Sequence, residues 1–184
     1  MPSSLDLSSL LAGIQNPVRR SVFLSYHHSG DQQYYDALTR FLHDTYEIIY
    51  DNSLDRIIDS EDASYVLQRI RENFVKGSSC TIVLCGADTP WRKYVDWEIK
   101  ATLDMMHGLL GVNLPTNRRN ENGHSIVPDR LHDNIQSGYA VWTDWTTFES
   151  SAITAKSLVE QAILKPSALI RNGRKMISRN GTPP

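Results

Sequence analysis

Apolar residues in this chain gather into short runs that alternate with segments of helical periodicity. A short apolar run bounded by turn residues is typical of a buried strand. Apolar residues at i, i+3, i+4 and i+7 are typical of an amphipathic helix. The pattern therefore predicts strands at 18–26, 47–50, 79–85, 109–113 and 139–145, and helices at about 31–42, 62–74, 89–106 and 152–164.

The predicted helix at 89–106, TPWRKYVDWEIKATLDMM, places one carboxylate next to aromatic rings. Glu98 follows Trp91 and Tyr94 at helical spacing, at the edge of the apolar face. Asp96 and Lys100 fall elsewhere on the helix and are expected to be solvated. A lone glutamate on a helix is usually a surface residue. Glu98 is a candidate for function only because of its expected position relative to the strands. The expected buried face consists of Val95, Ile99, Thr102, Leu103 and Met106.

The alternation of strands and helices predicts one α/β domain with a mostly parallel, five-stranded sheet and helices on both faces. With the first strand central, as in flavodoxin-like folds, the strand order is 2-1-3-4-5. Ligands then bind beyond the carboxyl ends of strands 1 and 3, where the winding reverses. We expect the turns at 25–31 and 86–91 to meet there, with the loop at 51–61 overhanging the same edge. Glu98 is expected about two turns into the helix that borders this crevice.

The chain divides into three parts. Residues 1–17 form an N-terminal extension in which the spacing of four apolar residues fits a short helix. Residues 18–165 form the α/β domain, in which the polar segment 114–137 is expected to be a long loop. Residues 166–184 form a basic tail, and such tails are more often solvated or disordered than binding devices.

Composition narrows the class of protein. The formal net charge of −2 over 184 residues argues against nucleic acid as the main partner. No apolar run approaches the ~18 residues of a membrane helix, and the N-terminus lacks a signal-peptide pattern. Cys80 and Cys85 lie in one apolar run and are expected to be buried thiols, which suits a reducing cytoplasm. The histidines are scattered, which indicates no metal site, and GxGxxG is absent.

Several features, in order along the chain, resemble one family. The first strand ends in FLSYHH (23–28), and a long loop follows the second strand. The third strand reads TIVLCG (81–86), and the next helix carries YVDWEI (94–99). Together they resemble the TIR-like domain of the Thoeris ThsB family of bacterial antiphage proteins, over about residues 18–165. Tyr94 departs from the pattern, because this family usually has tryptophan four residues before the glutamate.

The resemblance implies an enzyme that cleaves the nicotinamide–ribose bond of NAD. The product would be a cyclic or conjugated ADP-ribose signal that activates a separate effector during phage infection. NAD would be the substrate, so no further cofactor is implied; a phage-derived trigger and a TIR homo-oligomer are implied partners. Nicotinamide departs neutral, so the reaction mainly needs one carboxylate that stabilises an oxocarbenium-like ribose. Glu98 is assigned that catalytic role.

Aromatic and histidine residues are expected to surround this carboxylate. Trp91, Tyr94 and Tyr26 would form the walls of a water-poor site and stack on the substrate. The alternative for each ring is that it fills the core, and for Tyr94 the two interpretations carry equal weight. Adjacent residues on a strand point in opposite directions, so at most one of His27 and His28 faces the site. The resemblance favours His27, and the alternative is a turn histidine bonded to the backbone.

Three polar residues complete the expected site. Ser25 would bond the substrate or cap its own turn, and Arg92 would meet the diphosphate or remain an exposed cation. Asp51 and the loop that follows it would gate the pocket. The substrate-binding set expected from the sequence is Ser25, Tyr26, His27, Asp51, Trp91, Arg92 and Tyr94.

Two other functions fit the same chain. One is a catalytically silent TIR module that acts only by assembly with other TIR domains. The other is an enzyme related to nucleoside deoxyribosyltransferases, which also use a glutamate at an anomeric carbon. Glu98 with its aromatic neighbours favours NAD cleavage over the silent module, and the absence of a second acidic motif weighs against the nucleoside enzyme. Incubation with NAD or with a nucleoside separates them.

Overall fold

The computed structural model describes residues 19–49 and 62–182 of the chain. The helix expected at 1–17 and the loop expected at 51–61 lie outside these residues. Within the described part, no helix has both the length and the apolar character needed to cross a membrane.

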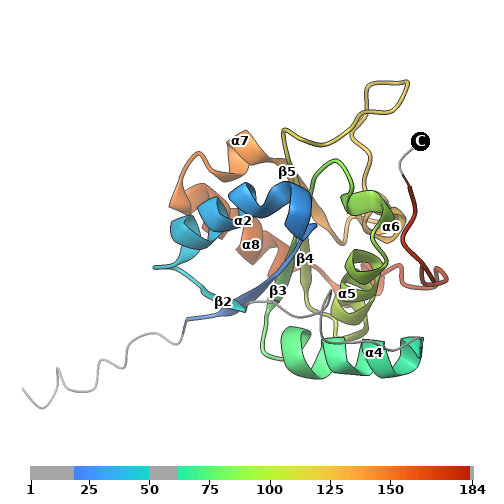
Figure 1. The fold of residues 1–184 in the computed structure, drawn as a ribbon. Coiled ribbons are helices and arrows are strands. Elements are labelled where there is room, and N and C mark those ends of the chain that lie inside the picture. The colour runs from blue at the N-terminus through green and yellow to red at the C-terminus, as the bar shows by residue number, and fades with distance from the viewer. Residues whose placement is uncertain (1–18, 50–61, 183–184) are drawn as a thin grey trace, which may run out of the picture.

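A five-stranded sheet forms the centre of the protein (Figure 1). All four strand pairings are parallel, and the order is β2-β1-β3-β4-β5. This confirms the predicted α/β class and strand order, including the reversal of winding between β1 and β3. The strands are β1 (Ser21–Ser25), β2 (Glu47–Ile49), β3 (Cys80–Cys85), β4 (Gly108–Asn113) and β5 (Val141–Asp144).

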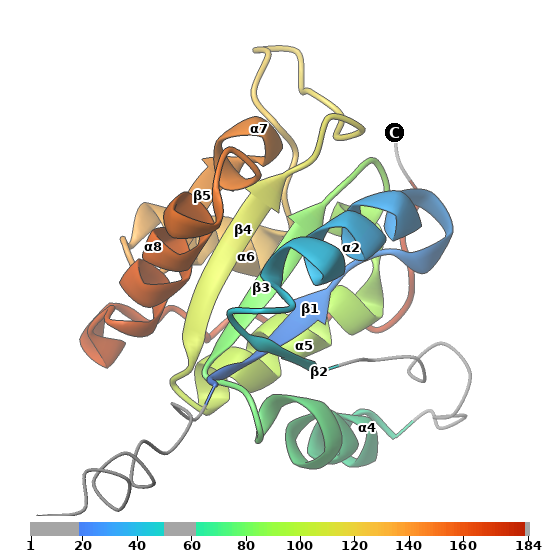
Figure 2. The same ribbon diagram turned by 90° about the vertical axis from the view of Figure 1, so that its left-hand side faces the viewer.

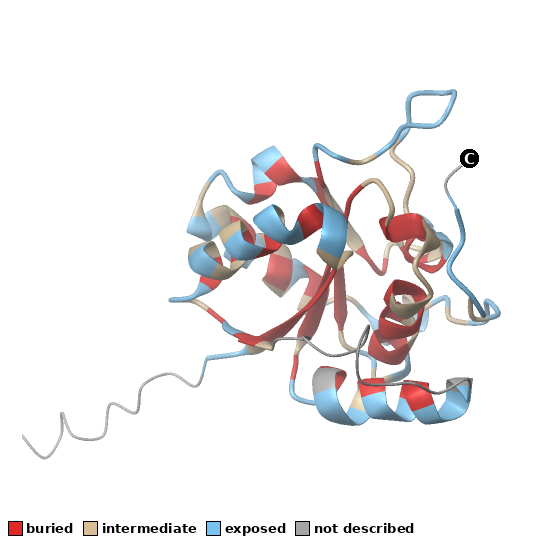
Figure 3. Ribbon diagram, viewed as in Figure 1, coloured by how far each residue is buried: buried red, intermediate tan, exposed pale blue. Residues whose placement is uncertain are grey.

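Helices cover both faces of the sheet (Figure 2). One layer packs on the cluster that contains Val22, Leu24 and Ile82, and the other packs on the clusters around Phe23 and Val83. The central strands β1, β3 and β4 are almost wholly buried, whereas the edge strands β2 and β5 are partly exposed (Figure 3). The first layer holds α2 (His28–Leu42), α7 (Trp145–Phe148) and α8 (Ala152–Ile163), and the second holds α4 (Ala63–Ile70), α5 (Lys93–Asp104) and α6 (Asp129–Gln136).

Two contacts fix the layers closely against the sheet. A Cβ atom at Gly108 would lie 2.8 Å from the backbone nitrogen of Ile163, so only glycine permits this approach of α8 to β4. On the other face, the hydroxyl oxygens of Thr81 on β3 and Thr102 on α5 are 2.6 Å apart and both residues are buried. This hydrogen bond fixes α5 along the direction of the strands.

The helix predicted at 89–106 is shorter than expected. A 3-10 turn, η2 (Thr89–Trp91), comes first, Arg92 is extended, and α5 begins one residue later. The buried Thr89 hydroxyl accepts a hydrogen bond from the amide of Gly86, which holds the turn against the end of β3. The prediction that Met106 lies on the buried face was wrong. Its backbone is left-handed (φ 56°) after the end of α5, and the residue is 65% exposed.

The segment 114–137 contains a helix, so its prediction as a loop throughout was wrong. In α6 the fully buried positions include Arg130 and Asn134 as well as Leu131. Two polar residues on the inward face remove the apolar periodicity that signals an amphipathic helix. The helix was therefore missed because its buried face depends on polar partners.

The basic tail is largely exposed, as expected, but hydrogen bonds hold it on the domain. It runs back along α6 and α5, where the Asn134 side chain exchanges hydrogen bonds with the backbone of Arg171 at 2.8 and 2.9 Å. Further on, the Trp97 indole N–H donates to the carbonyl of Ile177 at 2.8 Å, and the amide of Gly181 donates to the carbonyl of Trp91 at 2.9 Å. The tail therefore covers the helix that carries Glu98.

Candidate active site

Glu98 lies on the face of α5 that packs on the sheet, and it is 5% exposed. Its neighbours divide between two clusters: Val95 and Ile99 pack on one side, and Trp97 and Ala101 pack on the other. Thr102, one turn later, donates to the backbone carbonyl of Glu98 at 2.8 Å. The carboxylate is therefore held between two apolar clusters and not on the surface.

The level of Glu98 along the sheet follows from the bond between Thr102 and Thr81. As a crossover helix between parallel strands, α5 runs opposite to them, so Glu98 lies one turn, about 5.4 Å, nearer their carboxyl ends. Two strand residues span about 6.6 Å, which places Glu98 level with Val83. Val83 is the register partner of Ser25 on β1.

Ser25 is the last residue of β1 and is 1% exposed. By strand alternation its side chain lies on the same face as Phe23, which packs in the cluster with Trp97 on α5. Among the described residues, nothing forms a hydrogen bond with the Ser25 hydroxyl. The fold therefore brings Ser25 to the face and level of Glu98, with hydrogen-bonding capacity that the protein does not use.

Tyr26 lies on the opposite side of the sheet. Its ring stacks on Tyr35 at 4.5 Å and lies 4.3 Å from the ring of His28, in the cluster beneath α2. Its hydroxyl donates to Gln32 at 2.9 Å. Tyr26 is thus separated from Glu98 by the sheet, and the ring of Tyr26 fills the core, which was the alternative interpretation.

A group of charged side chains gathers around Asp88, between β3 and η2. His27 precedes α2; its Nε2 lies 2.7 Å from the hydroxyl of Ser29 and 3.9 Å from Asp88. Arg92 Nη2 donates to Asp88 at 3.3 Å, and Arg118 Nη2 lies 3.8 Å from the same carboxylate. His27 and Arg92 are therefore brought together, as expected from the sequence, although Asp88 already partners both.

The aromatic candidates Trp91 and Tyr94 are both half-buried. Gly181 of the tail packs on the Trp91 ring, and the Tyr94 ring meets Trp97 edge-on at 5.8 Å. The ammonium group of Lys93 lies 4.9 Å from the centre of the Tyr94 ring. Tyr94 also contacts the apolar cluster beneath α5, so part of its surface fills the core. Asp51, the remaining candidate, lies outside the described residues.

A buried carboxylate that the sequence does not indicate lies at the reversal of winding. Asp31, on the first turn of α2, is 2% exposed and accepts hydrogen bonds from Thr116 at 3.0 Å and Thr89 at 3.4 Å. Burial raises the pKa of this carboxyl above its ordinary value. From the sequence Asp31 is only a capping residue, because its partners lie 58 and 85 positions away.

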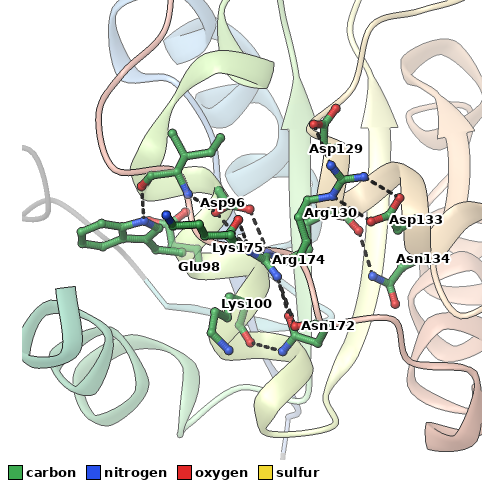
Figure 4. A network of polar contacts seen from close by, with 12 residues as sticks. Asp96, Glu98, Lys100, Asp129, Arg130, Asp133, Asn134, Asn172, Arg174 and Lys175 are labelled. Carbon is green, nitrogen blue, oxygen red and sulfur yellow. Dashed lines mark hydrogen bonds and ion pairs between the residues drawn. The ribbon is translucent and has the colours of Figure 1, made fainter.

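The structure also overturns the expectation that Asp96 is solvated. Its carboxylate forms a bidentate ion pair with Arg130 of α6, at 2.8 and 3.3 Å, and both side chains are buried (Figure 4). Asp96 also accepts from the amide of Ile177, and Arg130 donates to Asn172, so the pair joins α5, α6 and the tail. No local signal predicts this pair, because α6 itself was missed.

The parallel sheet, its strand order and a buried glutamate on the helix after β3 define a TIR-like α/β domain. The family model for the TIR-like domain of the Thoeris protein ThsB matches residues 23–119, a little more than half of the chain. The chain therefore belongs to the Thoeris ThsB TIR-like family, which places it in antiphage defence. No curated protein matches the chain.

Proposed function

We propose that this chain cleaves the nicotinamide–ribose bond of NAD, with Glu98 as the catalytic residue. The observation that carries the proposal is the burial of Glu98 on the face, and at the level, of Ser25. A carboxylate in a water-poor site acts more strongly on a developing positive charge than one on the surface. Family membership adds that the setting is antiphage defence.

The proposed reaction balances without an external oxidant or reductant. The bond between the ribose C1′ and the nicotinamide nitrogen breaks, and its electron pair leaves with neutral nicotinamide. The ribose becomes oxocarbenium-like, and the charge of Glu98 stabilises it. A hydroxyl or amine nucleophile then forms a bond to C1′ and loses its proton, which gives a cyclic or conjugated ADP-ribose. NAD is the substrate, and the proposal needs no further cofactor.

The residues around Glu98 support distinct roles in this proposal. The Ser25 hydroxyl is free to bond a ribose hydroxyl, because no described residue partners it. Trp91 and Tyr94 offer half-buried ring surface near the start of the helix, which suits stacking on a nicotinamide ring. Arg92 is paired with Asp88, so binding a diphosphate would require it to exchange one anion for another.

The product is proposed to activate a separate effector, with a phage-derived trigger and homo-oligomer formation controlling the enzyme. A cytoplasmic location follows from NAD as substrate and from the free thiols of Cys80 and Cys85, which are both buried. The trigger and the oligomer would make the activity conditional. This agrees with the burial of Glu98, which is only 5% exposed in the single chain.

The test is to incubate the full chain, at rising concentration and with extract of phage-infected cells, with NAD or with a deoxynucleoside. Mass analysis then identifies the nucleotide product. A product with the mass of cyclic ADP-ribose or of an ADP-ribose conjugate supports the proposal. Consumption of the nucleoside instead would favour the deoxyribosyltransferase alternative. Stable oligomers with no conversion of either substrate would favour the silent assembly module.

A further inference from the structure

A cavity of about 270 Å³ lies at the carboxyl ends of β4 and β5. Asn113 and Asp144 end these strands and are register partners, so their side chains lie on the same side of the sheet. In the strand order β5 is three positions from β1, or about 14 Å at 4.8 Å for each strand. The cavity is therefore displaced along the sheet from Ser25, although the loop at 114–119 that lines it also contacts Asp31 through Thr116 and Asp88 through Arg118. Its polar lining and one aromatic wall come from Asn113, Asn117, Arg119, Ser125, Asp144 and Trp145.

A chain of amide hydrogen bonds holds the Asp144 carboxylate in place. The side-chain amide of Asn117 donates to Asn113 Oδ1 at 2.9 Å, and Asn113 Nδ2 in turn donates to Asp144 Oδ1 at 2.9 Å. The second carboxylate oxygen of Asp144 accepts no hydrogen bond from any residue that the structure describes. A fixed carboxylate at the end of a parallel strand is well suited to accept a hydrogen bond from a sugar hydroxyl.

The cavity is also lined by a cation, Arg119. Arg119 pairs through its backbone with Ser125 in an antiparallel bridge, and its Nη1 donates to the carbonyl of Gly123 at 2.8 Å. The guanidinium has further N–H donors, and a planar array of donors suits a phosphate. The cavity thus offers both an acceptor for hydroxyl groups and a donor array for an anion.

We propose that this cavity binds a pentose phosphate. Asp144 accepts a hydrogen bond from a sugar hydroxyl, and Arg119 binds the phosphate. The volume of 270 Å³ lies just below the range of about 300–1,000 Å³ typical of drug-sized ligand sites, which favours a sugar phosphate over a whole dinucleotide. Trp145 and Leu114 also line the cavity, but they are 7% and 1% exposed, so the polar side chains carry the proposed recognition. This site does not depend on the proposed cleavage of NAD.

The test is an NMR titration of the full-length protein with ribose 5-phosphate and, separately, with inorganic phosphate. Asp144→Asn keeps the shape of the side chain, and Arg119→Gln removes the cation; each is expected to weaken binding of ribose 5-phosphate by about tenfold or more. Glu149→Gln is the matched control, since Glu149 is exposed and does not line the cavity. Urea unfolding confirms that each variant is folded.

The expected result is saturable binding of ribose 5-phosphate, with amide shifts at residues 113–125 and 144–146, and much weaker binding of phosphate alone. Equal affinity for phosphate and ribose 5-phosphate would overturn the proposal, because it would reduce the site to an anion contact. Unchanged binding by Asp144→Asn, or no saturation at millimolar ligand, would overturn it as well. Nicotinamide release from NAD is a separate readout, so failure here leaves the proposed function standing.

Discussion

The buried ion pair between Asp96 and Arg130 gives the sharpest prediction about what holds the helix of Glu98 in place. The exposed fractions of the two side chains are 3% and 0%. Asp96→Asn keeps the shape of the side chain but leaves the Arg130 guanidinium buried without a counter-charge. Removing one partner of a buried pair costs about 3–5 kcal/mol, so the free energy of unfolding should fall by that amount.

The cost follows from desolvation and not from the attraction alone. A buried charge that loses its partner keeps its full solvation penalty, whereas removing both charges removes the penalty too. The double variant Asp96→Leu/Arg130→Met should therefore lose much less stability than the sum of the two single variants. Arg20→Gln is the control, because its pair with Glu160 is half exposed and should be worth no more than about 1 kcal/mol.

Urea unfolding followed by tryptophan fluorescence measures these differences. For a chain of this size each kcal/mol shifts the midpoint of thermal unfolding by about 2–4 °C. Asp96→Asn should therefore lower the midpoint by about 6–20 °C. A loss below about 1 kcal/mol, or single-variant losses that simply add in the double variant, would refute the reasoning.

Three further predictions follow from buried groups elsewhere. A Cβ at Gly86 would overlap the carboxylate of Asp31, so Gly86→Ala should lower the free energy of unfolding in urea by about 1–3 kcal/mol. The double variant Gly86→Ala/Asp31→Ala should recover part of this loss. If the losses of the two single variants simply add in the double variant, the contact is contradicted. Burial raises the pKa of Asp31, so above its ordinary pKa of about 4 the folded state binds more protons than the unfolded state. The free energy of unfolding therefore falls as pH rises above about 4, and Asp31→Asn should remove this fall. An unchanged slope of stability against pH would contradict the prediction. Burial also raises the pKa of the Cys80 and Cys85 thiols. A disulfide reagent should therefore modify neither thiol in the folded protein and both thiols in denaturant. Rapid modification of either thiol in the folded protein would contradict their burial.

The sequence predicted the sheet well because its signals are local. The apolar run at 79–85 became β3, and its neighbours took the order expected for a flavodoxin-like domain. Glu98 lies on the helix that was expected to carry it. Trp91 lies in the 3-10 turn before that helix, so helical spacing does not relate the two residues, and the closeness of Glu98 to Trp91 and Tyr94 stays a prediction. Periodicity and turn residues therefore predicted the positions of the strands and of the helices with an apolar face, but not α6 or α7.

What the sequence missed depends on contacts between distant residues. Arg130 lies 34 positions after Asp96, and a buried polar face conceals α6 from any search for apolar periodicity. The tail was missed for a related reason, since its backbone is held by side chains of α5 and α6 such as Trp97 and Asn134. Nothing local in the basic segment encodes those partners.

The placement of Tyr26 was also beyond the sequence. Strand alternation says that neighbouring residues face opposite ways, but it does not say which of Ser25 and Tyr26 faces α5. The stack on Tyr35 decides it, and this leaves Ser25 on the face of Glu98.

The most direct test of the account is the rate at which Glu98→Gln releases nicotinamide from NAD, compared with the wild type and with Glu149→Gln as an exposed control. Both variants should unfold at the urea midpoint of the wild type within error, so that only the charge at residue 98 differs. The account predicts a loss of about 10²-fold or more for Glu98→Gln and none for Glu149→Gln. Equal rates for Glu98→Gln and an active wild type would contradict the central claim that this buried carboxylate stabilises the reacting ribose.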